Sequence, residues 1–562
     1  MRRFVSIVAA IAVAAAVAAC AASTSTVPAH AAGFKTGGTL TVGLVGDITY
    51  ADPMFANDVS STYVENQVVE GLVGLRPGSS SVVVPVLASA LPTVSADGLT
   101  YTFKLRSGIK FHDGTNLDAA AVKSNYDRWN TLPKGDLQNA AQDFKSVFGG
   151  FGDASNLASV TAADSQTVVI ALRKPQSNFL ITQANVAFGI QSPEALKDND
   201  ATNATLAKNP YALGTGGKGK AMVGTGPFVF SERVAGDHVT LTKNADYWNK
   251  TDAAYVDRIV FKPFADAVTA GKALTSGSVD MLDLVDPATL KSIKGSTSVS
   301  ILDRGQSCNV TQLAMYNANT LQSGATNVLA DDNVRMAIAW AVDKQALVND
   351  TYGGAAIVAD NWAPPGSLDY KREYLPGFDV NKARGFMALA GRATTKTAVD
   401  LWYPTGGPWA SLIDVKGFAT TVAANLSGIG ITATLKTEAA ANFNADSAAG
   451  KFQMWLSSQD CVWDSVDYFI NTAFFHYVAG TPSPQFAYTN DTLAATMTSA
   501  LAALDAASAK SGWQQAEDLL PVDMPTLPLV HAKLPGAARS YVHGVIASGS
   551  MVEILSSVWL DK

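Results

Sequence analysis

Cysteine, histidine and charge are scarce in this sequence. Its 562 residues include 3 Cys and 6 His, and only 16% of the residues are charged. Three cysteines exclude a scaffold held together by many disulfides and any zinc module that needs four cysteines. The 41 Lys and Arg against 48 Asp and Glu give a net charge of −7, and no dense basic block occurs. We therefore expect no nucleic-acid partner, because nucleic-acid binding relies on clustered positive charge.

Hydrophobic residues, by contrast, are plentiful. They make up 48% of the chain, which excludes disorder as its main state. The length exceeds the roughly 250–300 residues that one hydrophobic core supports, so we expect two or more domains. Beyond the N-terminus, no uninterrupted apolar segment is long enough for a membrane-spanning helix, which needs about 20 residues.

The N-terminus has the pattern of a signal peptide over residues 1–19. Arg2 and Arg3 precede an apolar run over residues 5–19, and small residues directly precede Cys20. These small residues and Cys20 resemble the bacterial lipobox, in which the cysteine is lipidated through its sulfur and becomes the new N-terminus. The alternative is an ordinary signal peptide cleaved near Ala31. Residues 20–35 are small and polar and predict a flexible tether. We expect a protein anchored by lipid to the outer face of a cell membrane, or a periplasmic one.

Strand and helix patterns alternate along the rest of the chain and predict an α/β protein. Residues 99–106 alternate apolar and polar side chains, and Asp118 is placed to cap the helix that follows. We predict strands at 39–45, 99–106, 167–172, 228–230, 238–242, 259–263, 398–403, 431–436 and 452–456. We predict helices at 118–129, 265–276 and 333–348, and a mostly helical segment at 493–520.

Short sequence blocks follow one another in a characteristic order. Residues 97–106 read Asp-Gly-Leu-Thr-Tyr-Thr-Phe-Lys-Leu-Arg, and residues 109–114 read Ile-Lys-Phe-His-Asp-Gly. The others are Tyr-Ala-Asp-Pro at 50–53, Glu-Gly-Leu-Val at 70–73, Gly-Thr-Gly-Pro-Phe at 224–228, Asn-Ala-Asp-Tyr-Trp at 244–248, Leu-Thr-Ser-Gly-Ser-Val-Asp at 274–280, Asn-Val-Arg-Met-Ala at 333–337 and Asp-Met-Pro-Thr-Leu-Pro at 523–528. Together they make residues 36–548 resemble the extracytoplasmic solute-binding proteins of family 5, the peptide/nickel-binding type.

This resemblance implies a two-lobed periplasmic-binding-protein-like fold of type II with an extra subdomain inserted in lobe I. Lobe I would comprise residues 36–77, 223–305 and 535–562, the inserted subdomain 78–222, and lobe II 306–534. Ligand would bind in the cleft between the lobes, and closure would bury it.

The function implied by the resemblance is that of a receptor for an ABC importer. Such a receptor captures a small peptide and delivers it to the permease subunits in the membrane. Oligosaccharide-binding and metal-chelate-binding members of the same family are alternatives, and a secreted hydrolase on this scaffold is an alternative from another class. We expect a monomer that binds its ligand without enzymatic chemistry.

Candidate ligand-binding residues follow from the same resemblance. In peptide-binding relatives an aspartate between a strand and a helix pairs with the α-amino group of the peptide. Asp460 and Asp464 both fit this position, and both could instead cap the helix that begins near Tyr468. Ser465 and Val466 stand where the family has Asp-Pro. Further candidates are aromatic or amide side chains expected in the cleft, namely Trp402, Tyr403, Trp463, Trp362, Asn361, Asn57 and Tyr63.

No cofactor or resident metal is expected. The six histidines are scattered without a pair at metal-ligand spacing. The Gly-rich stretch at residues 214–221 resembles a phosphate-binding loop but lacks the Ser or Thr that such loops use to hold Mg²⁺.

The odd number of cysteines has a simple interpretation. If Cys20 carries lipid, Cys308 and Cys461 remain as an even pair in an oxidising compartment. We predict a disulfide between them, with two buried free thiols as the alternative.

Overall fold

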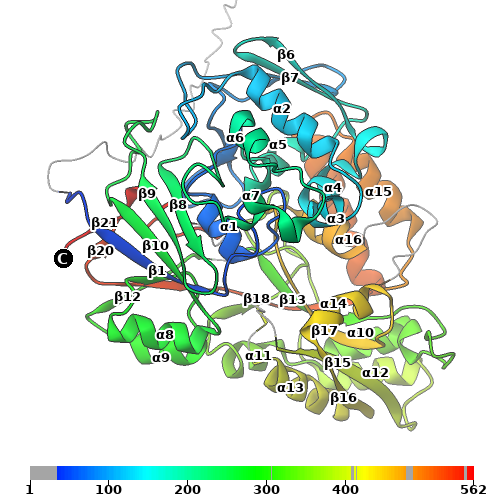
Figure 1. The fold of residues 1–562 in the computed structure, drawn as a ribbon. Coiled ribbons are helices and arrows are strands. Elements are labelled where there is room, and N and C mark those ends of the chain that lie inside the picture. Colours follow the sequence, from blue (N-terminus) through cyan, green and yellow to red (C-terminus); the bar gives the residue numbers. More distant parts are fainter. Residues whose placement is uncertain (1–33, 306, 407–410, 413, 476–484, 550–552) are drawn as a thin grey trace, which may run out of the picture.

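Three sheets organise the chain in the computed structural model (Figure 1). The structure describes residues 34–562 except 306, 407–410, 413, 476–484 and 550–552. Within these residues, no helix is both long and apolar enough to span a membrane. The signal peptide, the lipidated Cys20 and nearly all of the predicted tether lie outside the described residues.

The first sheet has seven strands in the order β12-β19-β11-β1-β10-β9-β8. We call the part of the chain built on it lobe I. Strand β1 runs parallel to β10 and β11, and helices α8 and α9 pack together beside it. The elements are β1 (Thr39–Val45), β8 (Phe228–Val234), β9 (His238–Lys243), β10 (Arg258–Phe264), β11 (Met281–Leu282), β12 (Val299–Leu302), β19 (Gly536–Arg539), α1 (Val59–Glu65), α8 (Ala267–Ser276) and α9 (Pro287–Ile293).

The second sheet has six strands in the order β14-β18-β13-β17-β15-β16, and it carries lobe II. Strands β13 and β18 are buried along their whole length, which places them at the centre of the core. The strands are β13 (Asn309–Met315), β14 (Ala356–Val358), β15 (Thr397–Thr405), β16 (Ile431–Ala439), β17 (Met454–Asp460) and β18 (Thr526–Ala532). The helices are α10 (Asp332–Ala341), α11 (Lys344–Asp350), α12 (Val380–Leu389), α13 (Val415–Ser427), α14 (Ala440–Ala448), α15 (Asp491–Leu501) and α16 (Ala506–Asp523).

A four-stranded sheet in the order β4-β5-β7-β6 forms a third unit, which we call the inserted region. Its hydrophobic core is continuous with that of lobe II, whereas most of the lobe I core is a separate cluster. Its elements are β4 (Thr93–Val94), β5 (Thr100–Lys104), β6 (Leu157–Asp164), β7 (Thr167–Leu172), α2 (Ala119–Asn130), α3 (Asp136–Ala140), α4 (Gln142–Phe148), α5 (Phe179–Thr182), α6 (Pro193–Asp198) and α7 (Pro210–Leu213). Two strand pairs complete the fold, β2 (Val73–Leu75) with β3 (Val83–Pro85) and β20 (Val542–His543) with β21 (Trp559–Leu560).

The chain crosses between the lobes at residues 303–308 and 533–535, and one arginine joins the two crossings. The guanidinium of Arg304 forms a fully buried ion pair with Glu553 at 2.6 Å and donates a hydrogen bond to the Leu534 carbonyl at 2.9 Å. The Ser307 hydroxyl donates to the Lys533 carbonyl at 2.8 Å. The two crossings therefore form one hinge with a shared buried ion pair.

Two close approaches in lobe I require glycine. A Cβ on Gly224 would lie 2.2 Å from the Val68 carbonyl oxygen, and one on Gly226 would lie 2.8 Å from the same backbone. Neither contact leaves room for a side chain, so the Gly-Thr-Gly-Pro block at 224–227 packs its backbone directly against the segment after α1.

Two predicted helical segments are each divided in the structure. The segment 333–348 forms α10 and α11, because Asp343 accepts a hydrogen bond from the Ala346 amide and caps a new helix. The segment 493–520 forms α15 and α16, and Asp505 caps α16 in the same way. The prediction of one helix over 333–348 was wrong because a polar cap inside the apolar pattern starts a second helix, whereas the prediction that 493–520 is mostly helical is confirmed.

Candidate ligand-binding cavity

A cavity of about 1560 Å³ is lined by residues of lobe I, lobe II and the inserted region. This volume exceeds the roughly 300–1,000 Å³ of most small-molecule pockets. Its wall includes the end of β1, the segment after β11, helix α4 and the end of β17. Four distant segments of the sequence thus meet around one space.

Strand β17 brings Asp460 to the wall. The strand pairs along its length with β13, and Asn309 lies opposite Asp460. The Cys461 amide donates to the Cys308 carbonyl at 3.0 Å, and the Tyr468 hydroxyl donates to the Asp460 carbonyl at 3.1 Å. These bonds hold the Asp460 backbone, while its side chain lines the cavity.

The Asp460 carboxylate has one oxygen without any hydrogen-bond partner. This Oδ1 atom is buried, and a side-chain hydrogen bond from Ser411 is the one interaction that favours the charged form. Burial raises the pKa of Asp460 to about 6. A buried carboxylate of this kind is stabilised when a ligand brings a positive charge to it.

Asp464 has the opposite environment. It is 3% exposed, and its two carboxylate oxygens accept hydrogen bonds from the hydroxyls of Ser80 and Ser367. Burial raises the pKa of Asp464, and the two serine hydrogen bonds oppose the rise. Because Ser80 precedes β3 and lines the cavity, its bond to Asp464 connects lobe II to another part of the wall, whereas Ser367 belongs to lobe II itself.

Neither aspartate caps the following helix. That segment, Tyr468–Phe475, is a π-helix, and the Tyr468 amide donates to the Ser465 hydroxyl at 3.3 Å. The alternative role of Asp460 and Asp464 as helix caps is therefore wrong. Ser465 takes that place, at the position where the family has Asp-Pro.

Cys308 and Cys461 form a disulfide in the structure, with Cα atoms 5.5 Å apart. Cys308 directly precedes β13, and Cys461 directly follows β17 and lines the cavity. The bond therefore joins two neighbouring strands beside Asp460.

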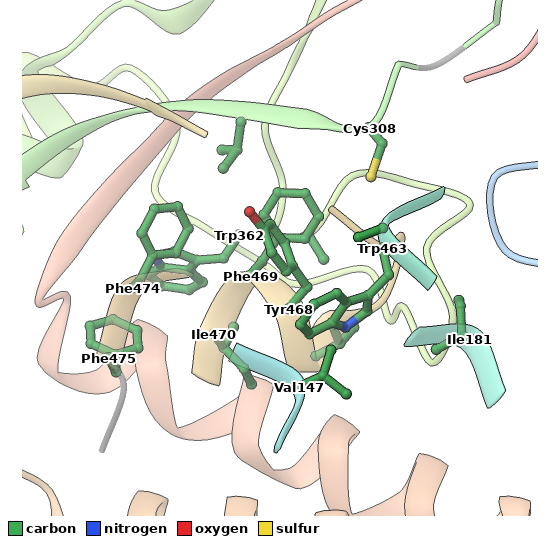
Figure 2. Packing of buried hydrophobic residues seen from close by; sticks show 14 of the residues in the cluster. Val147, Ile181, Cys308, Trp362, Trp463, Tyr468, Phe469, Ile470, Phe474 and Phe475 are labelled. Carbon is green, nitrogen blue, oxygen red and sulfur yellow. The ribbon is translucent and has the colours of Figure 1, made fainter. Parts of the chain in front are cut away.

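Trp463 and Tyr468 form the aromatic part of the wall near Asp460. Their ring centroids lie 5.0 Å apart in an edge-to-face arrangement, and the Trp463 indole nitrogen donates to Asp467 at 3.2 Å. Figure 2 shows both side chains in the cluster that also contains Val147 and Ile181 of the inserted region. Lobe II and the inserted region thus share hydrophobic contacts next to the cavity.

Five predicted cleft residues lie away from the wall. Trp362 and Asn361 are fully buried in lobe II, where the Trp362 indole donates to Thr526 at 2.8 Å and the Asn361 amide donates to the Lys371 carbonyl and to Glu517. Trp402 stacks on Phe452 with centroids 4.7 Å apart. Tyr403 is 8% exposed in the same core, and Tyr63 is buried in lobe I against Phe261. Core packing, rather than ligand contact, explains the positions of Trp362, Asn361, Trp402, Tyr403 and Tyr63.

Asn57 lines the cavity, but its side-chain amide nitrogen already donates two hydrogen bonds within the protein. It donates to the Ala140 carbonyl at 2.9 Å and to the Phe55 carbonyl at 3.3 Å. Asn57 therefore connects lobe I to the inserted region at the edge of the wall.

Two acidic residues that line the cavity were not identified from the sequence. Asp143 lies in the first turn of α4, and Asp283 follows β11. Burial raises the pKa of Asp143 to about 7 and that of Asp283 to about 6. No sequence motif surrounds either residue. An acid in the first turn of a helix, such as Asp143, commonly stabilises the helix through its dipole and so does not indicate a binding site.

The described residues contain one group spaced closely enough to hold a metal ion, namely Cys308, Cys461 and Asp464. Its two sulfurs are joined to each other, so they are not available as thiolate ligands. This group therefore does not form a metal site in the oxidised protein.

Two sheets joined by a double crossing, with a large cavity lined by both lobes, define a two-lobed solute-binding protein. Residues 82–481 match the family "Bacterial extracellular solute-binding proteins, family 5 Middle". The chain belongs to this family, whose members act outside the cytoplasm.

Named relatives agree with this assignment. The chain is 33% identical over 357 residues to the glutathione-binding protein GsiB of Escherichia coli (strain K12), an alignment that covers 62% of this chain and 61% of that protein. It is 29% identical over 519 residues to GsiB of Salmonella paratyphi A, covering 90% of this chain and 91% of the relative. These relatives are substrate-binding proteins.

Solved structures show the same fold. The periplasmic binding protein DppA from Helicobacter pylori, in complex with the peptide STSA, matches with a TM-score of 0.76 at 21% identity and covers 94% of this chain and 99% of that one. A dipeptide-binding protein from Pseudoalteromonas sp. SM9913, in complex with Met-Leu, matches with a TM-score of 0.75 at 19% identity and covers 93% of this chain and 100% of that one.

Proposed function

We propose that this protein is an ABC-importer receptor that captures a small peptide in its cavity and delivers it to the permease. The unpartnered Oδ1 atom of the Asp460 carboxylate is the observation that carries the proposal. It is held at the end of a paired strand, it lines the cavity, and it offers a buried negative charge to the α-ammonium group of a peptide. The related proteins named for glutathione and the peptide-bound structures of the same fold support this choice.

Isothermal titration calorimetry with Ala-Met and N-acetyl-Ala-Met tests the role of Asp460. Acetylation removes the positive charge, so the wild type should bind the free peptide at least about 10-fold more tightly, a difference of about 1.4 kcal/mol. Asp460→Asn should lose most of this difference. Asp400→Asn, a substitution on β15 outside the wall, is the matched control. Equal binding of both peptides by the wild type would refute the amine pairing.

The same titrations separate the alternative functions. Binding of an oligosaccharide such as maltotriose, with no response to peptides, would replace the peptide assignment. We propose that ligand is released unchanged, without enzymatic chemistry. Time-dependent consumption of a bound peptide would instead support a hydrolase.

We propose that the mature protein is a monomer attached to the membrane by a lipid on Cys20, after removal of the signal peptide 1–19. The tether 20–35 then links the anchor to the folded part. A Cys20→Ser variant should partition into the aqueous phase of a detergent extraction, whereas the wild type should follow the detergent. Partition of both into the same phase would refute the anchor.

We propose that residues 36–77, 223–305 and 535–562 form lobe I, 78–222 the inserted subdomain and 306–534 lobe II. The strands of the seven-, six- and four-stranded sheets fall within lobe I, lobe II and the inserted subdomain respectively, which supports the division. Limited proteolysis should cut first near these boundaries in the absence of ligand.

A further inference from the structure

The cavity wall carries a large excess of negative charge. Among the described residues that line it are eleven carboxylates, three arginines, and no lysine or histidine. Such an imbalance matters only if some of these carboxylates are not already neutralised within the protein.

Most of the wall carboxylates have partners. Four of them cap helix N-termini, at α1, α8, α9 and α13, although the α9 cap, Asp286, uses only Oδ1 and its Oδ2 atom has no partner. Glu70 accepts hydrogen bonds from Thr225, Tyr247 and Trp248. The remaining ones with partners are Asp464 with its two serines, Asp47 with Arg233, and Asp252 with Asn249.

Three carboxylates are poorly paired, and each comes from a different part of the molecule. Asp460 of lobe II and Asp283 of lobe I each have an Oδ1 atom without a hydrogen-bond partner, and Asp283 is only 5% exposed. Asp143 of the inserted region has a side-chain hydrogen bond from Asn185, which only partly opposes the effect of burial on its pKa. Burial, and then the charges of Asp143 and Asp460, raise the pKa of Tyr468, which lines the same cavity as both acids.

No arginine of the wall forms an ion pair with these three acids, although Arg304 lowers the pKa of Asp283 and so partly opposes the effect of burial. Arg304 lies near Asp283, but its guanidinium is bonded to Glu553 and to the Leu534 carbonyl. Arg106 donates to the Val86 carbonyl at 2.7 Å and lies over the Trp248 ring. Arg76 is exposed to solvent. A carboxylate buried without a cation is unfavourable, and a positively charged ligand group supplies what the protein does not.

We propose that the ligand is a cationic peptide, whose second positive charge is bound by Asp143 beside the amine-binding Asp460. The inference rests on the proposed peptide function and names the substrate class. A short peptide with a lysine or arginine side chain has both cations. Glutathione has one amine and two carboxylates, so this wall disfavours it, although relatives are named for it.

Calorimetry with Ala-Lys, Ala-Met, Ala-Glu and glutathione tests the inference. These dipeptides share the amine and differ in the charge of a side chain of similar length. We expect Ala-Lys to bind about 10-fold or more tightly than Ala-Met, and Ala-Glu and glutathione to bind most weakly. Asp143→Asn should weaken Ala-Lys at least about 5-fold more than it weakens Ala-Met. Asp153→Asn, an exposed acid of the same region outside the wall, is the matched control.

The outcomes separate this inference from the proposed function. Equal affinities for the three dipeptides, or tighter binding of Ala-Glu or glutathione, would overturn the cationic preference and leave a peptide receptor. No binding of any peptide would overturn the proposed function itself. The wild-type ranking does not depend on whether Asp143→Asn folds, and circular dichroism shows whether it does.

Discussion

Asp460 and Asp464 are four residues apart and differ in what surrounds them. The end of β17 presents Asp460 to the cavity with one oxygen unpartnered, whereas two serine hydroxyls give each oxygen of Asp464 a hydrogen-bond partner. Residue type and spacing left both candidates open. Which aspartate is available to a ligand depends on Ser80 and Ser367. Ser80 is 384 residues and Ser367 is 97 residues from Asp464 in the sequence, and both reach it only in the folded protein.

The first prediction concerns the pH dependence of peptide affinity. Burial raises the pKa of Asp460 to about 6, so the free protein holds a proton there at lower pH. A ligand ammonium favours the ionised form and must displace that proton. Affinity for Ala-Met should therefore be full above about pH 7 and fall up to about 10-fold per pH unit below pH 6.

Calorimetric titrations with Ala-Met from pH 8 to pH 5 measure this pH dependence of affinity. In the Asp460→Asn variant, the affinity should change much less with pH. Asp143 and Asp283 titrate in the same range, so the comparison with the variant isolates the share of Asp460. A wild-type affinity that stays constant down to pH 5 would contradict the assignment of Asp460.

At the scale of elements, local sequence patterns predict several helix starts. Asp118 accepts a hydrogen bond from the Ala121 amide and caps α2, as its position before the helix indicates. Asp343 acts in the same way, but it lies within an apolar pattern that predicts one continuous helix over 333–348. One helix was predicted in place of two because the hydrophobic periodicity continues across a short break, and a single capping residue does not interrupt it.

The second prediction concerns the disulfide between the start of β13 and the end of β17. It closes a loop of 153 residues, which corresponds to at most about 5 kcal/mol in the chain-entropy model. Replacing both Cys308 and Cys461 by serine should lower the melting temperature by several degrees. It should also weaken Ala-Met binding, because Asp460 is adjacent to the bond.

Differential scanning calorimetry and titration of the double variant check this expectation. Wild-type protein treated with a reductant should behave like the variant, which separates loss of the bond from the effect of the serines. An unchanged melting temperature in both samples would show that strand pairing alone holds β17.

At the scale of the whole molecule, the inserted region contacts lobe II across the cavity. Ser80 bonds Asp464, Asn178 bonds Asp467, and the Ser177 hydroxyl donates to the Ala500 carbonyl at 2.9 Å. The Asn185 amide donates to the Val462 carbonyl at 3.1 Å. These bonds hold the two sides together, while the hydrogen bond from Arg304 to the Leu534 carbonyl joins the two crossings at the hinge.

The third prediction is that Ser80→Ala combined with Asn178→Ala shifts the protein toward a more open state. Removing two bonds that exist only when the sides meet lowers the population of the closed form. Small-angle X-ray scattering should show a larger radius of gyration without ligand, and ligand affinity should fall accordingly. Ser89→Ala, which removes a bond within the inserted region, is the control. Identical scattering from all three proteins would contradict a role for these contacts in closure.

The sequence by itself determined the family, the α/β class and the pairing of the two cysteines that follow the tether. These three properties depend on local sequence patterns and on short blocks in a fixed order, both of which are visible in the sequence without the structure. The prediction that Trp362, Trp402 and Tyr403 line the cleft was wrong. The sequence pattern around an aromatic residue in a strand or loop is the same whether its side chain faces a core or a cavity.

Only the tertiary structure decided which acids remain available to a ligand. Asp143, Asp283 and Asp460 are separated by more than one hundred residues from one another, and folding brings them to one cavity. Whether a carboxylate is free depends on the donors that other segments place beside it. The charge of the cavity is therefore a property of the assembled lobes, since it is what remains after all internal pairing is complete.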